Sequence, residues 1–359
     1  MRMHDLRFRS PVTRVQVQEV TMHFREPFSI AYETVEDASV AFIRITDSKG
    51  NEGVGSASPD PEVTGETLQN TMRRLTDDIT PDFLNAYPNL QMLHTALEDA
   101  CSAVPSAQSA IEEATLSLLL RQSGLSMNDL FPPVRSNMTA TVTIGICSED
   151  ETLAQVQHRL KEGFTSLKVK CGIDVHEDIA KIEKVLGILP PECSLLLDAN
   201  QGYSLADAQQ VLKAFGSSDI ALIEQPVAAE DIAGLRTLHQ MKSIPVIADE
   251  SAVGVADSCR LLLEDDVAGV NVKLMKCGGP LNAAHIIRCA QEHGKIVMIG
   301  CMYESNVSLT TAAHLALAFD IDVADIDSGI MDFDDDPATG GLCIHNGRVS
   351  IGDPLHVSL

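Results

Sequence analysis

The alternation of short β-rich runs with amphipathic segments from Met138 onward constrains the fold more than any other feature of the chain. Eight such runs follow one another: MTATVTIGI, SLKVKCG, CSLLLDAN, IALIEQP, IPVIADES, GVNVKLMKCGG, KIVMIGCMYES and ADIDSG. The segments between them, such as EDETLAQVQHRLKEG, have apolar residues at helical spacing. Eight parallel strand–helix units close into a barrel. We therefore predict an α/β fold with a (β/α)8-type, modified TIM barrel over residues 137–330.

The residues before the barrel have a different pattern. Residues 13–57 alternate between apolar and polar side chains and include a Gly-containing turn, which is typical of antiparallel strands. Residues 66–126 have helical spacing with a stop near Gly124. We expect an α+β capping domain over residues 1–130. The tail, residues 331–359, has strand character, and we expect it to return to the capping domain.

The charge balance disfavours some classes of partner. The chain has 26 Lys+Arg against 51 Asp+Glu, a formal net charge of −25, and such a surface disfavours nucleic acids and anionic membranes. The N-terminal residues lack the apolar core of a signal peptide, and no apolar run reaches transmembrane length. Nine scattered cysteines without a C-x-x-C pair indicate reduced thiols, so we expect a cytoplasmic protein.

Three successive strand candidates end on a carboxylate: Asp198 in LLLDAN, Glu224 in LIEQP and Asp249 in VIADES. The carboxyl ends of barrel strands meet at one mouth, where the active sites of such barrels lie. Three oxygen donors without a neighbouring His or Cys suit a hard cation, Mg²⁺ rather than Zn²⁺. Each acid could instead cap the helix that follows it, but three in register favour a metal site.

Two lysines flank these carboxylates in strand order. Lys170 ends the preceding strand candidate and Lys273 the following one, so the order around the mouth is Lys, Asp, Glu, Asp, Lys. A lysine acts as a general base only when its pKa is lowered, by burial or by a nearby cation. Lys168 lies on the same side of its strand as Lys170, and its charge should favour neutral Lys170. The alternative is a pair of surface lysines on an edge strand.

The motifs KVK, DAN, EQP, ADES and NVKLMKCGG, in this order, resemble those of the enolase superfamily, muconate-lactonising-enzyme-like subgroup. The resemblance covers almost the whole chain, including VTGET in the expected capping domain. It implies an enolase-like fold and an isomerase with one Mg²⁺ per subunit. The ion holds a substrate carboxylate and stabilises the enediolate left when a lysine removes the α-proton.

The resemblance also assigns roles to individual residues. It implies that Asp198, Glu224 and Asp249 bind the metal and that Lys170 and Lys273 are the acid–base pair on opposite faces of the α-carbon. Lys168 tunes Lys170 and contacts the substrate carboxylate. It further implies a substrate contact at Thr143. We expect backbone groups near Cys301 and Met302 to bind the substrate carboxylate or amide, and Asn200, Glu250 and Cys301 to have supporting roles. Glu304 either orients a neighbour or starts the following helix.

The eighth strand candidate, ADIDSG, discriminates between the reactions of this scaffold. Asp325 and Asp327 lie on the same side of a strand, and such an Asp-x-Asp resembles that of dipeptide epimerases similar to L-Ala-D/L-Glu epimerase. Two carboxylates can hold the α-ammonium of a dipeptide by charge-assisted hydrogen bonds. We therefore expect a dipeptide epimerase. The alternatives are o-succinylbenzoate synthase, N-succinyl amino acid racemase, a cycloisomerase and, from another class, a non-catalytic binding barrel. The two acids could also belong to an acidic turn, since DFDDDP follows closely.

Two loops of the capping domain, FREPFSIAYETV and SASPDPEVTGET, should set substrate specificity in such a family. Relatives that act on acidic dipeptides carry a cation in the first loop, where this chain has Glu33, and the second loop adds Asp60 and Glu62. An anionic pocket attracts a Lys or Arg side chain. The acids could also belong to the generally acidic surface, and Arg25 could oppose them. The expected partner is a small-molecule dipeptide, with a homo-oligomer possible.

Overall fold

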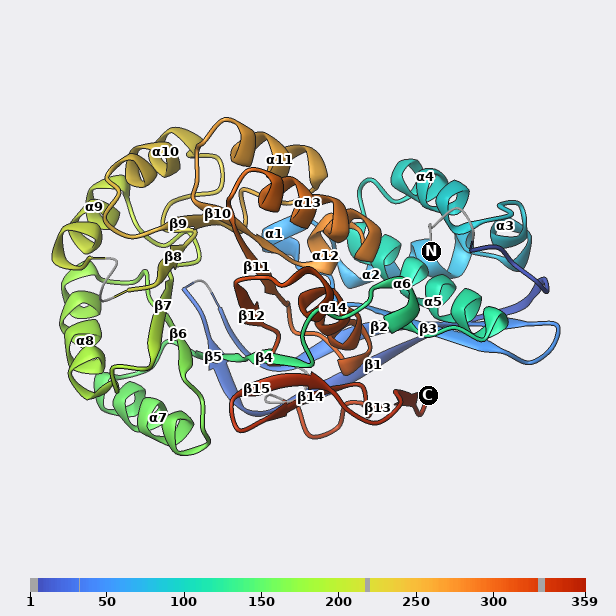
Figure 1. The fold of residues 1–359 in the computed structure, drawn as a ribbon, viewed down its shortest axis with the longest axis horizontal. Coiled ribbons are helices and arrows are strands. Elements are labelled where there is room, and N and C mark those ends of the chain that lie inside the picture. Colours follow the sequence, from blue (N-terminus) through green and yellow to red (C-terminus); the bar gives the residue numbers. More distant parts are fainter. Residues whose placement is uncertain (1–5, 32, 217–219, 329–332) are drawn as a thin grey trace.

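The computed structural model describes residues 6–31, 33–216, 220–328 and 333–359. Figure 1 shows two parts side by side, a barrel with its helices on the left and a three-stranded sheet with helices on the right. The eight parallel strands and the antiparallel N-terminal sheet confirm the predicted enolase-like α/β fold.

The N-terminal sheet is antiparallel, in the order β1-β2-β3. Its strands are β1 (Val12–Ser29), β2 (Thr34–Asp47) and β3 (Glu52–Ala57). The helices that follow are α1 (Pro61–Thr64), α2 (Leu68–Arg73), a π-helical turn η2 (Arg74–Asp78), α3 (Pro81–Asn85), α4 (Leu90–Ala100), α5 (Pro105–Ser123) and α6 (Met127–Leu130). Helix α5 ends at Gly124, whose φ of 67° is the left-handed conformation expected of a helix stop.

Helix α5 lies directly on the backbone of β3 because two glycines of that strand leave room for it. A Cβ atom at Gly53 would stand 1.9 Å from the carbonyl oxygen of Ala114, and one at Gly55 would stand 1.9 Å from that of Ala110. The helix is therefore buried on most of its surface. It also contacts the turn after Lys273, where a Cβ at Gly279 would meet Glu112. Helix α5 therefore packs between the N-terminal sheet and the turn that follows β10 of the barrel.

The barrel strands stand in chain order, and each neighbouring pair is parallel. They are β5 (Thr141–Ile144), β6 (Ser166–Lys170), β7 (Ser194–Asp198), β8 (Leu222–Glu224), β9 (Val246–Ala248), β10 (Gly269–Val272), β11 (Ile296–Gly300) and β12 (Val323–Asp325). The bridge Ala140↔Ala324 brings the last strand against the first, so the barrel nearly closes. Leu196, Leu222, Ile247 and Met298 form a separate small apolar cluster among these strands.

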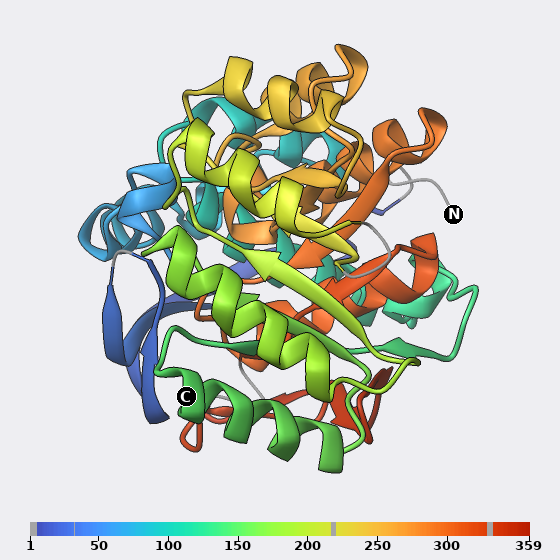
Figure 2. The same cartoon turned by 90° about the vertical axis from the view of Figure 1, so that its left-hand side faces the viewer.

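The helices after these strands cover the outside of the barrel, as Figure 2 shows. They are α7 (Glu149–Lys161), α8 (Val175–Ile188), α9 (Leu205–Ala214), α10 (Ile232–Gln240), α11 (Val255–Leu263), α12 (Leu274–Cys277), α13 (Pro280–Glu292) and α14 (Asn306–Phe319). At the N-terminus of several of these helices, a side chain of the capping residue accepts a backbone N–H group of the first turn. In α7 the hydroxyl of Ser148 and the carboxylate of Glu151 form a capping box. No helix among the described residues is long and apolar enough to span a membrane.

The first predicted barrel run, residues 138–146, is divided at Ala140. Strand β4 (Asn137–Thr139) pairs with β15 (Arg348–Ile351), and only β5 enters the barrel sheet. The other C-terminal strands are β13 (Ala338–Thr339), β14 (Leu342–His345) and β16 (His356–Val357).

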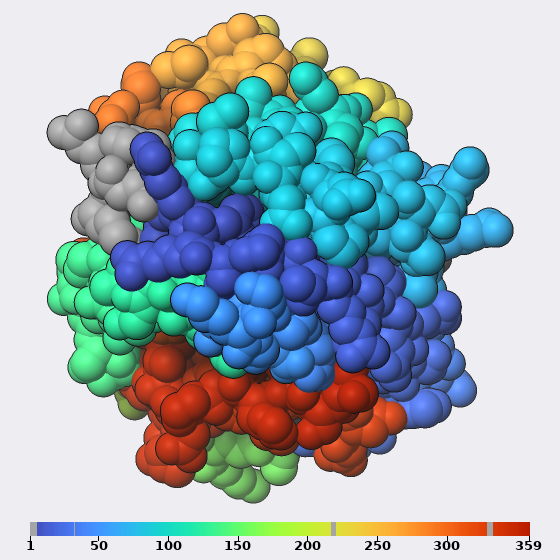
Figure 3. Space-filling view, turned by 90° about the vertical axis from the view of Figure 1, so that its right-hand side faces the viewer, coloured from blue at the N-terminus to red at the C-terminus, as the bar shows by residue number. Residues whose placement is uncertain are grey.

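The C-terminal segment lies beside the N-terminal sheet, as Figure 3 shows on one face of the molecule. Phe333 and Ala338 pack in one buried cluster with Met22 and Phe42. These contacts join described residues of the C-terminal segment to the N-terminal sheet, and the predicted domain division stays a prediction.

Candidate active site

Adjacent strand ends bring the predicted charged residues into one row at the mouth of the barrel. Lys170 is the partner of Asp198 in the parallel register, and Asp198 is the partner of Glu224. Each of the three is the last residue of its strand. Asp249 and Lys273 stand one residue beyond β9 and β10. All five side chains are buried, so their charges must be balanced within the site.

Lys170 makes two contacts with the loop end of the next strand. Its Nζ donates to Asp198 Oδ2 at 2.6 Å and to Asn200 Oδ1 at 2.7 Å. The amide of Asn200 in turn donates to Glu250 Oε1 at 3.1 Å. The predicted supporting residues Asn200 and Glu250 therefore form a chain of hydrogen bonds that begins at Lys170.

Lys168 lies deeper and contacts three carboxylates. Its Nζ is 3.2 Å from Glu224 Oε2 and 3.5 Å from Asp198 Oδ2, and it forms an ion pair with Asp325. Burial alone would lower the pKa of Lys168, but these carboxylates outweigh it and raise that pKa well above its usual value. The proposed influence of Lys168 on Lys170 stays a prediction.

On the other side of the mouth, Asp249 is held between two lysines. Lys273 Nζ is 2.8 Å from Asp249 Oδ2, and Lys276 Nζ is paired with Oδ1. Burial would raise the pKa of Asp249, but the two ammonium groups hold it well below its usual value. For Lys273, burial lowers the pKa, yet Asp249 and Glu224 outweigh burial and raise that pKa well above normal.

Lys276 is a residue that the sequence interpretation missed. It is 1% exposed, and its Nζ also donates to the carbonyl oxygens of Asp249 at 2.7 Å and Asn271 at 3.0 Å. Asn271 donates its own amide to Glu224 Oε1 at 2.5 Å. The only available signal was a second lysine in KLMKCGG, which does not by itself reveal a buried ion pair.

The donor set fits a hard cation. Within the part of the chain that the structure describes, no three acidic, His or Cys side chains gather at metal-ligand distance. Each of the three carboxylates is in contact with a lysine. Burial and the charge of Asp198 raise the pKa of Glu224 to about 8. Glu250 Oε2 is buried without a hydrogen-bond partner. Mg²⁺ would supply the missing positive charge, and the ligands are all oxygen.

The turns after β7 and β8 hold these ligands in unusual backbone conformations. Asn200 and Gln225 have φ values of 39° and 33°, a region that non-glycine residues rarely occupy. The side-chain oxygen Oε1 of Gln225 accepts the backbone N–H groups of Asp249 and Ser251 at 2.9 and 3.1 Å. The turn after β8, the strand that ends at Glu224, thereby orients Asp249, which follows β9.

The eighth and first strands meet at the predicted ammonium site. Thr143 donates its backbone N–H to Asp327 Oδ2 at 2.9 Å and its hydroxyl to Asp325 Oδ1 at 3.1 Å. Asp327 stands two residues past the end of β12, yet both acids line the same pocket. Burial and the neighbouring Asp325 raise the pKa of Asp327 to about 6.

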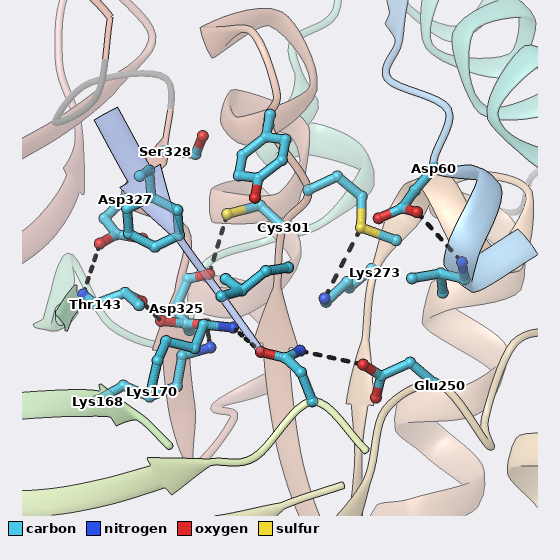
Figure 4. A pocket seen from close by; sticks show the side chains of 16 residues that line it. Asp60, Thr143, Lys168, Lys170, Glu250, Lys273, Cys301, Asp325, Asp327 and Ser328 are labelled. Carbon is cyan, nitrogen blue, oxygen red and sulfur yellow. Dashed lines mark hydrogen bonds and ion pairs between the residues drawn. The ribbon is translucent and has the colours of Figure 1, made fainter. Parts of the chain in front are cut away.

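One pocket gathers most of the predicted residues (Figure 4). Lys168 and Lys170 enter it from one side and Lys273 from the other, with Asp325 and Asp327 beside Thr143. The predicted residues that line it are Asp60, Thr143, Lys168, Lys170, Asn200, Glu250, Lys273, Cys301, Met302, Asp325 and Asp327. Phe28, Ile30, Val63, Tyr303 and Ser328 also line it and were not predicted.

The seventh strand contributes through its backbone and a buried acid. Glu304 Oε1 accepts the backbone N–H of Met302 at 2.9 Å, and burial raises the pKa of Glu304 to about 7. The Cys301 thiol lies 3.4 Å from the carbonyl oxygen of Asp325. Glu304 therefore lies behind the pocket and orients Met302, which lines it.

A second depression adjoins the pocket and carries the acidic loop residues. Glu33, Asp60 and Glu62 line it together with Met302 and Tyr303. The Tyr303 hydroxyl donates to Glu33 Oε1 at 3.3 Å. Burial, followed by the charge of Asp60, raises the pKa of Glu33, and burial raises the pKa of Asp60.

Two protein-family models and several known proteins match most of the chain. The model "Mandelate racemase / muconate lactonizing enzyme, N-terminal domain" matches residues 12–131, and "Enolase C-terminal domain-like" matches residues 151–354. The hydrophobic dipeptide epimerase of Enterococcus faecalis is 30% identical over 336 residues, 93% of this chain and 94% of that protein. The L-Lys-D/L-Arg epimerase of Desulforapulum autotrophicum is 32% identical over 94% of this chain and 98% of its own.

A solved structure shares the same overall arrangement. The dipeptide epimerase from Methylococcus capsulatus, complexed with Mg and the dipeptide L-Arg-D-Lys, superposes with a TM-score of 0.88 at 30% identity. The match covers 96% of this chain and 98% of that one. The similarity therefore extends over both the capping domain and the barrel.

Proposed function

The chain belongs to the mandelate racemase / muconate lactonizing enzyme family of the enolase superfamily, and we propose that it is a Mg²⁺-dependent dipeptide epimerase. One observation carries the proposal: Lys170 and Lys273 reach a pocket that also holds Asp325 and Asp327. Strands β6 and β10 are the second and sixth of eight, so the two lysines come from opposite sides of the barrel. Opposed bases suit inversion of a carbon centre.

The proposed reaction moves one proton off and one proton onto the same α-carbon. One lysine, as the free amine, breaks the C–H bond on its face, and the electron pair passes into the adjoining carboxylate as an enediolate. The opposing lysine, as the ammonium, returns a proton to the other face and forms the new C–H bond. Mg²⁺ held by Asp198, Glu224 and Asp249 would supply positive charge beside that carboxylate. It would also offset the charges of Asp249 and Glu224 that raise the pKa of Lys273, and so favour the free amine there.

The two acids after β12 favour a dipeptide over an N-acylated amino acid. Asp325 and Asp327 present carboxylate oxygens to the pocket, with Thr143 fixing both. An α-ammonium is attracted to such a pair by charge-assisted hydrogen bonds. A succinyl carboxylate would be repelled at the same position. We infer that the ammonium end binds here and that the C-terminal residue is the one inverted.

We further propose a preference for a cationic side chain. Glu33 and Asp60 share the depression beside the pocket, and burial together with their mutual repulsion raises the pKa of Glu33. A Lys or Arg side chain would relieve this repulsion. The charge of Arg25 is balanced in part by Asp334, whose Oδ1 lies 2.6 Å from the guanidinium Nε. Relatives of comparable similarity act on hydrophobic or on cationic dipeptides, so the preference rests on these loop charges.

Deuterium uptake at the α-carbon tests the reaction and the preference together. L-Ala-L-Lys and L-Lys-L-Ala would be incubated with the protein and Mg²⁺ in D₂O, each beside the analogue in which norleucine replaces Lys. Norleucine keeps the length of the side chain and removes its charge. We expect exchange with the Lys peptides to be faster by roughly fivefold or more, the factor worth about 1 kcal/mol of charge attraction.

The outcomes separate the two parts of the proposal. Equal rates with the Lys and norleucine peptides would keep the epimerase and remove the cationic preference. Uptake only with N-succinyl amino acids would replace the dipeptide by an acylated substrate. Uptake with none of these substrates would contradict the epimerase.

Two variants test the assignment of the bases. Lys170→Ala should abolish exchange in one diastereomer of the dipeptide, and Lys273→Ala should abolish it in the other. Persistent exchange in both diastereomers with both variants would contradict a two-base reaction. The cytoplasmic location and a homo-oligomeric state stay predictions.

A further inference from the structure

A carboxylate on the outer side of the barrel mouth joins three chain segments. Asp178 on α8 is 3% exposed, and its Oδ2 accepts the backbone N–H of Gly172 at 2.9 Å and the hydroxyl of Tyr203 at 2.8 Å. Its Oδ1 lies 3.2 Å from Lys181 Nζ on the same helix. Gly172 belongs to the loop after β6, and Tyr203 belongs to the loop after β7. One side chain therefore fixes both loops to α8.

The two loops are also in direct backbone contact. Gly172 has a φ of 106°, and a Cβ atom there would stand 2.5 Å from the carbonyl oxygen of Ala199. A Cβ at Gly202 would stand 2.2 Å from the carbonyl oxygen of Gly172. The backbone N–H of Cys171 donates to the carbonyl oxygen of Asp198 at 2.9 Å. A shift of one loop must therefore shift the other.

The inner side of the same loops carries Lys170 and its partners. Lys170 stands two residues before Gly172, and its Nζ is held by Asp198 and Asn200, which stand only a few residues before Tyr203. Lys273 lies elsewhere in the mouth, next to Asp249 and 3.9 Å from Met302 Sδ. Among the described residues, no hydrogen bond or ion pair joins Lys273 to Asp178 or Tyr203.

We propose that Asp178 and Tyr203 are positioning residues for Lys170, an inference that rests on the proposed two-lysine epimerisation. They hold the loops after β6 and β7 at the separation that places the Lys170 amine on its face of the α-carbon. A displacement of the base by 1 Å lowers the reaction rate steeply, by about 10²-fold. The effect is confined to one face of the substrate, because Lys273 is positioned by other residues.

Tyr203→Phe is the variant that isolates this role. It removes one hydroxyl and keeps a ring that is 5% exposed in the structure, so the packing of the loop is preserved. Exchange of the α-proton in D₂O is measured separately from each diastereomer of the dipeptide at early times. Lys170→Ala and Lys273→Ala identify the diastereomer that each lysine serves. Tyr87→Phe in the capping domain is the matched control.

We expect Tyr203→Phe to slow exchange from the diastereomer served by Lys170 by roughly tenfold and to leave the other unchanged, with KM unaltered. Asp178→Asn, which weakens both loop contacts, should slow the same diastereomer further. Tyr87→Phe should match the wild type.

Equal slowing of both diastereomers, or no slowing of either, would overturn the positioning role while leaving the epimerase intact. Absence of exchange in the wild type would instead overturn the proposed function, and the inference with it. Thermal unfolding of each variant, measured in parallel, detects a general loss of folding.

Discussion

The buried lysine behind the metal-ligand candidates offers the sharpest test of how the site is stabilised. Lys276 is 1% exposed and donates to the Asp249 carboxylate and to the carbonyl oxygens of Asp249 and Asn271. Lys276→Met keeps the length of the side chain and removes the ammonium. It leaves a buried carboxylate with one cation fewer and two buried carbonyl groups without this donor.

The expected loss of stability follows from these contacts. Removing one partner of a buried ion pair costs about 3–5 kcal/mol, and an unsatisfied buried carbonyl adds about 1 kcal/mol. Lys273 remains 2.8 Å from Asp249 and offsets part of the lost charge. We therefore expect the free energy of unfolding to fall by about 4 kcal/mol. With about 2.1 cal/mol/K of unfolding entropy per residue, a chain of 359 residues should lose roughly 5 °C in Tm.

Calorimetry in a chelating buffer measures this change without a contribution from bound metal. Lys184→Met is the matched control, because its pair with Glu149 is solvent-exposed and should contribute under about 1 kcal/mol. A Tm for Lys276→Met within about 1 °C of wild type would refute the view that Lys276 compensates the buried charge of Asp249.

Three further predictions concern packing, pH and metal. Gly55→Ala places a Cβ 1.9 Å from the carbonyl oxygen of Ala110 and should lower stability by about 1–3 kcal/mol or more in chemical denaturation, whereas Gly187→Ala, with open space, should not. Burial raises the pKa of Glu304 to about 7, so the free energy of unfolding of the wild type should fall as pH rises from about 4.5 through 7. At pH 8, Glu304→Gln should be more stable relative to the wild type than at low pH, by up to about 3 kcal/mol. A stability difference between the two proteins that does not change with pH would contradict this. Chelation should abolish α-proton exchange, and Mg²⁺ should restore it better than Zn²⁺; activity that survives chelation would exclude the metal site.

The positions at strand ends could be predicted from the sequence because they follow from a local pattern. A run such as SLLLDAN shows where a buried strand ends, and a parallel barrel sends every such end to one mouth. Lys170, Asp198 and Glu224 are accordingly strand-final in the structure. The same pattern does not reveal that the first run divides at Ala140, since the partner that takes β4 away from the barrel is β15, about 200 residues later.

The residues that the sequence did not reveal depend on contacts between distant segments. Tyr303 reaches Glu33 across 270 positions, and no local pattern relates the two. Lys276 and Asp178 look like ordinary charged residues of helical segments. Their importance comes from burial and from the carboxylate or loop that happens to face them, and both are properties of the assembled barrel.

The contact between the first and last barrel strands has a consequence for how the chain is made. Thr143 meets Asp327 across 184 positions of sequence, although the two are adjacent in the finished protein. Synthesis proceeds from the N-terminus, and domains tend to fold as they emerge. A growing chain therefore presents both lysines and all three candidate ligands before the acids that would recognise an ammonium exist. In the proposed epimerase, the ammonium site would therefore be completed after these other parts of the active site, when the final strand reaches the first.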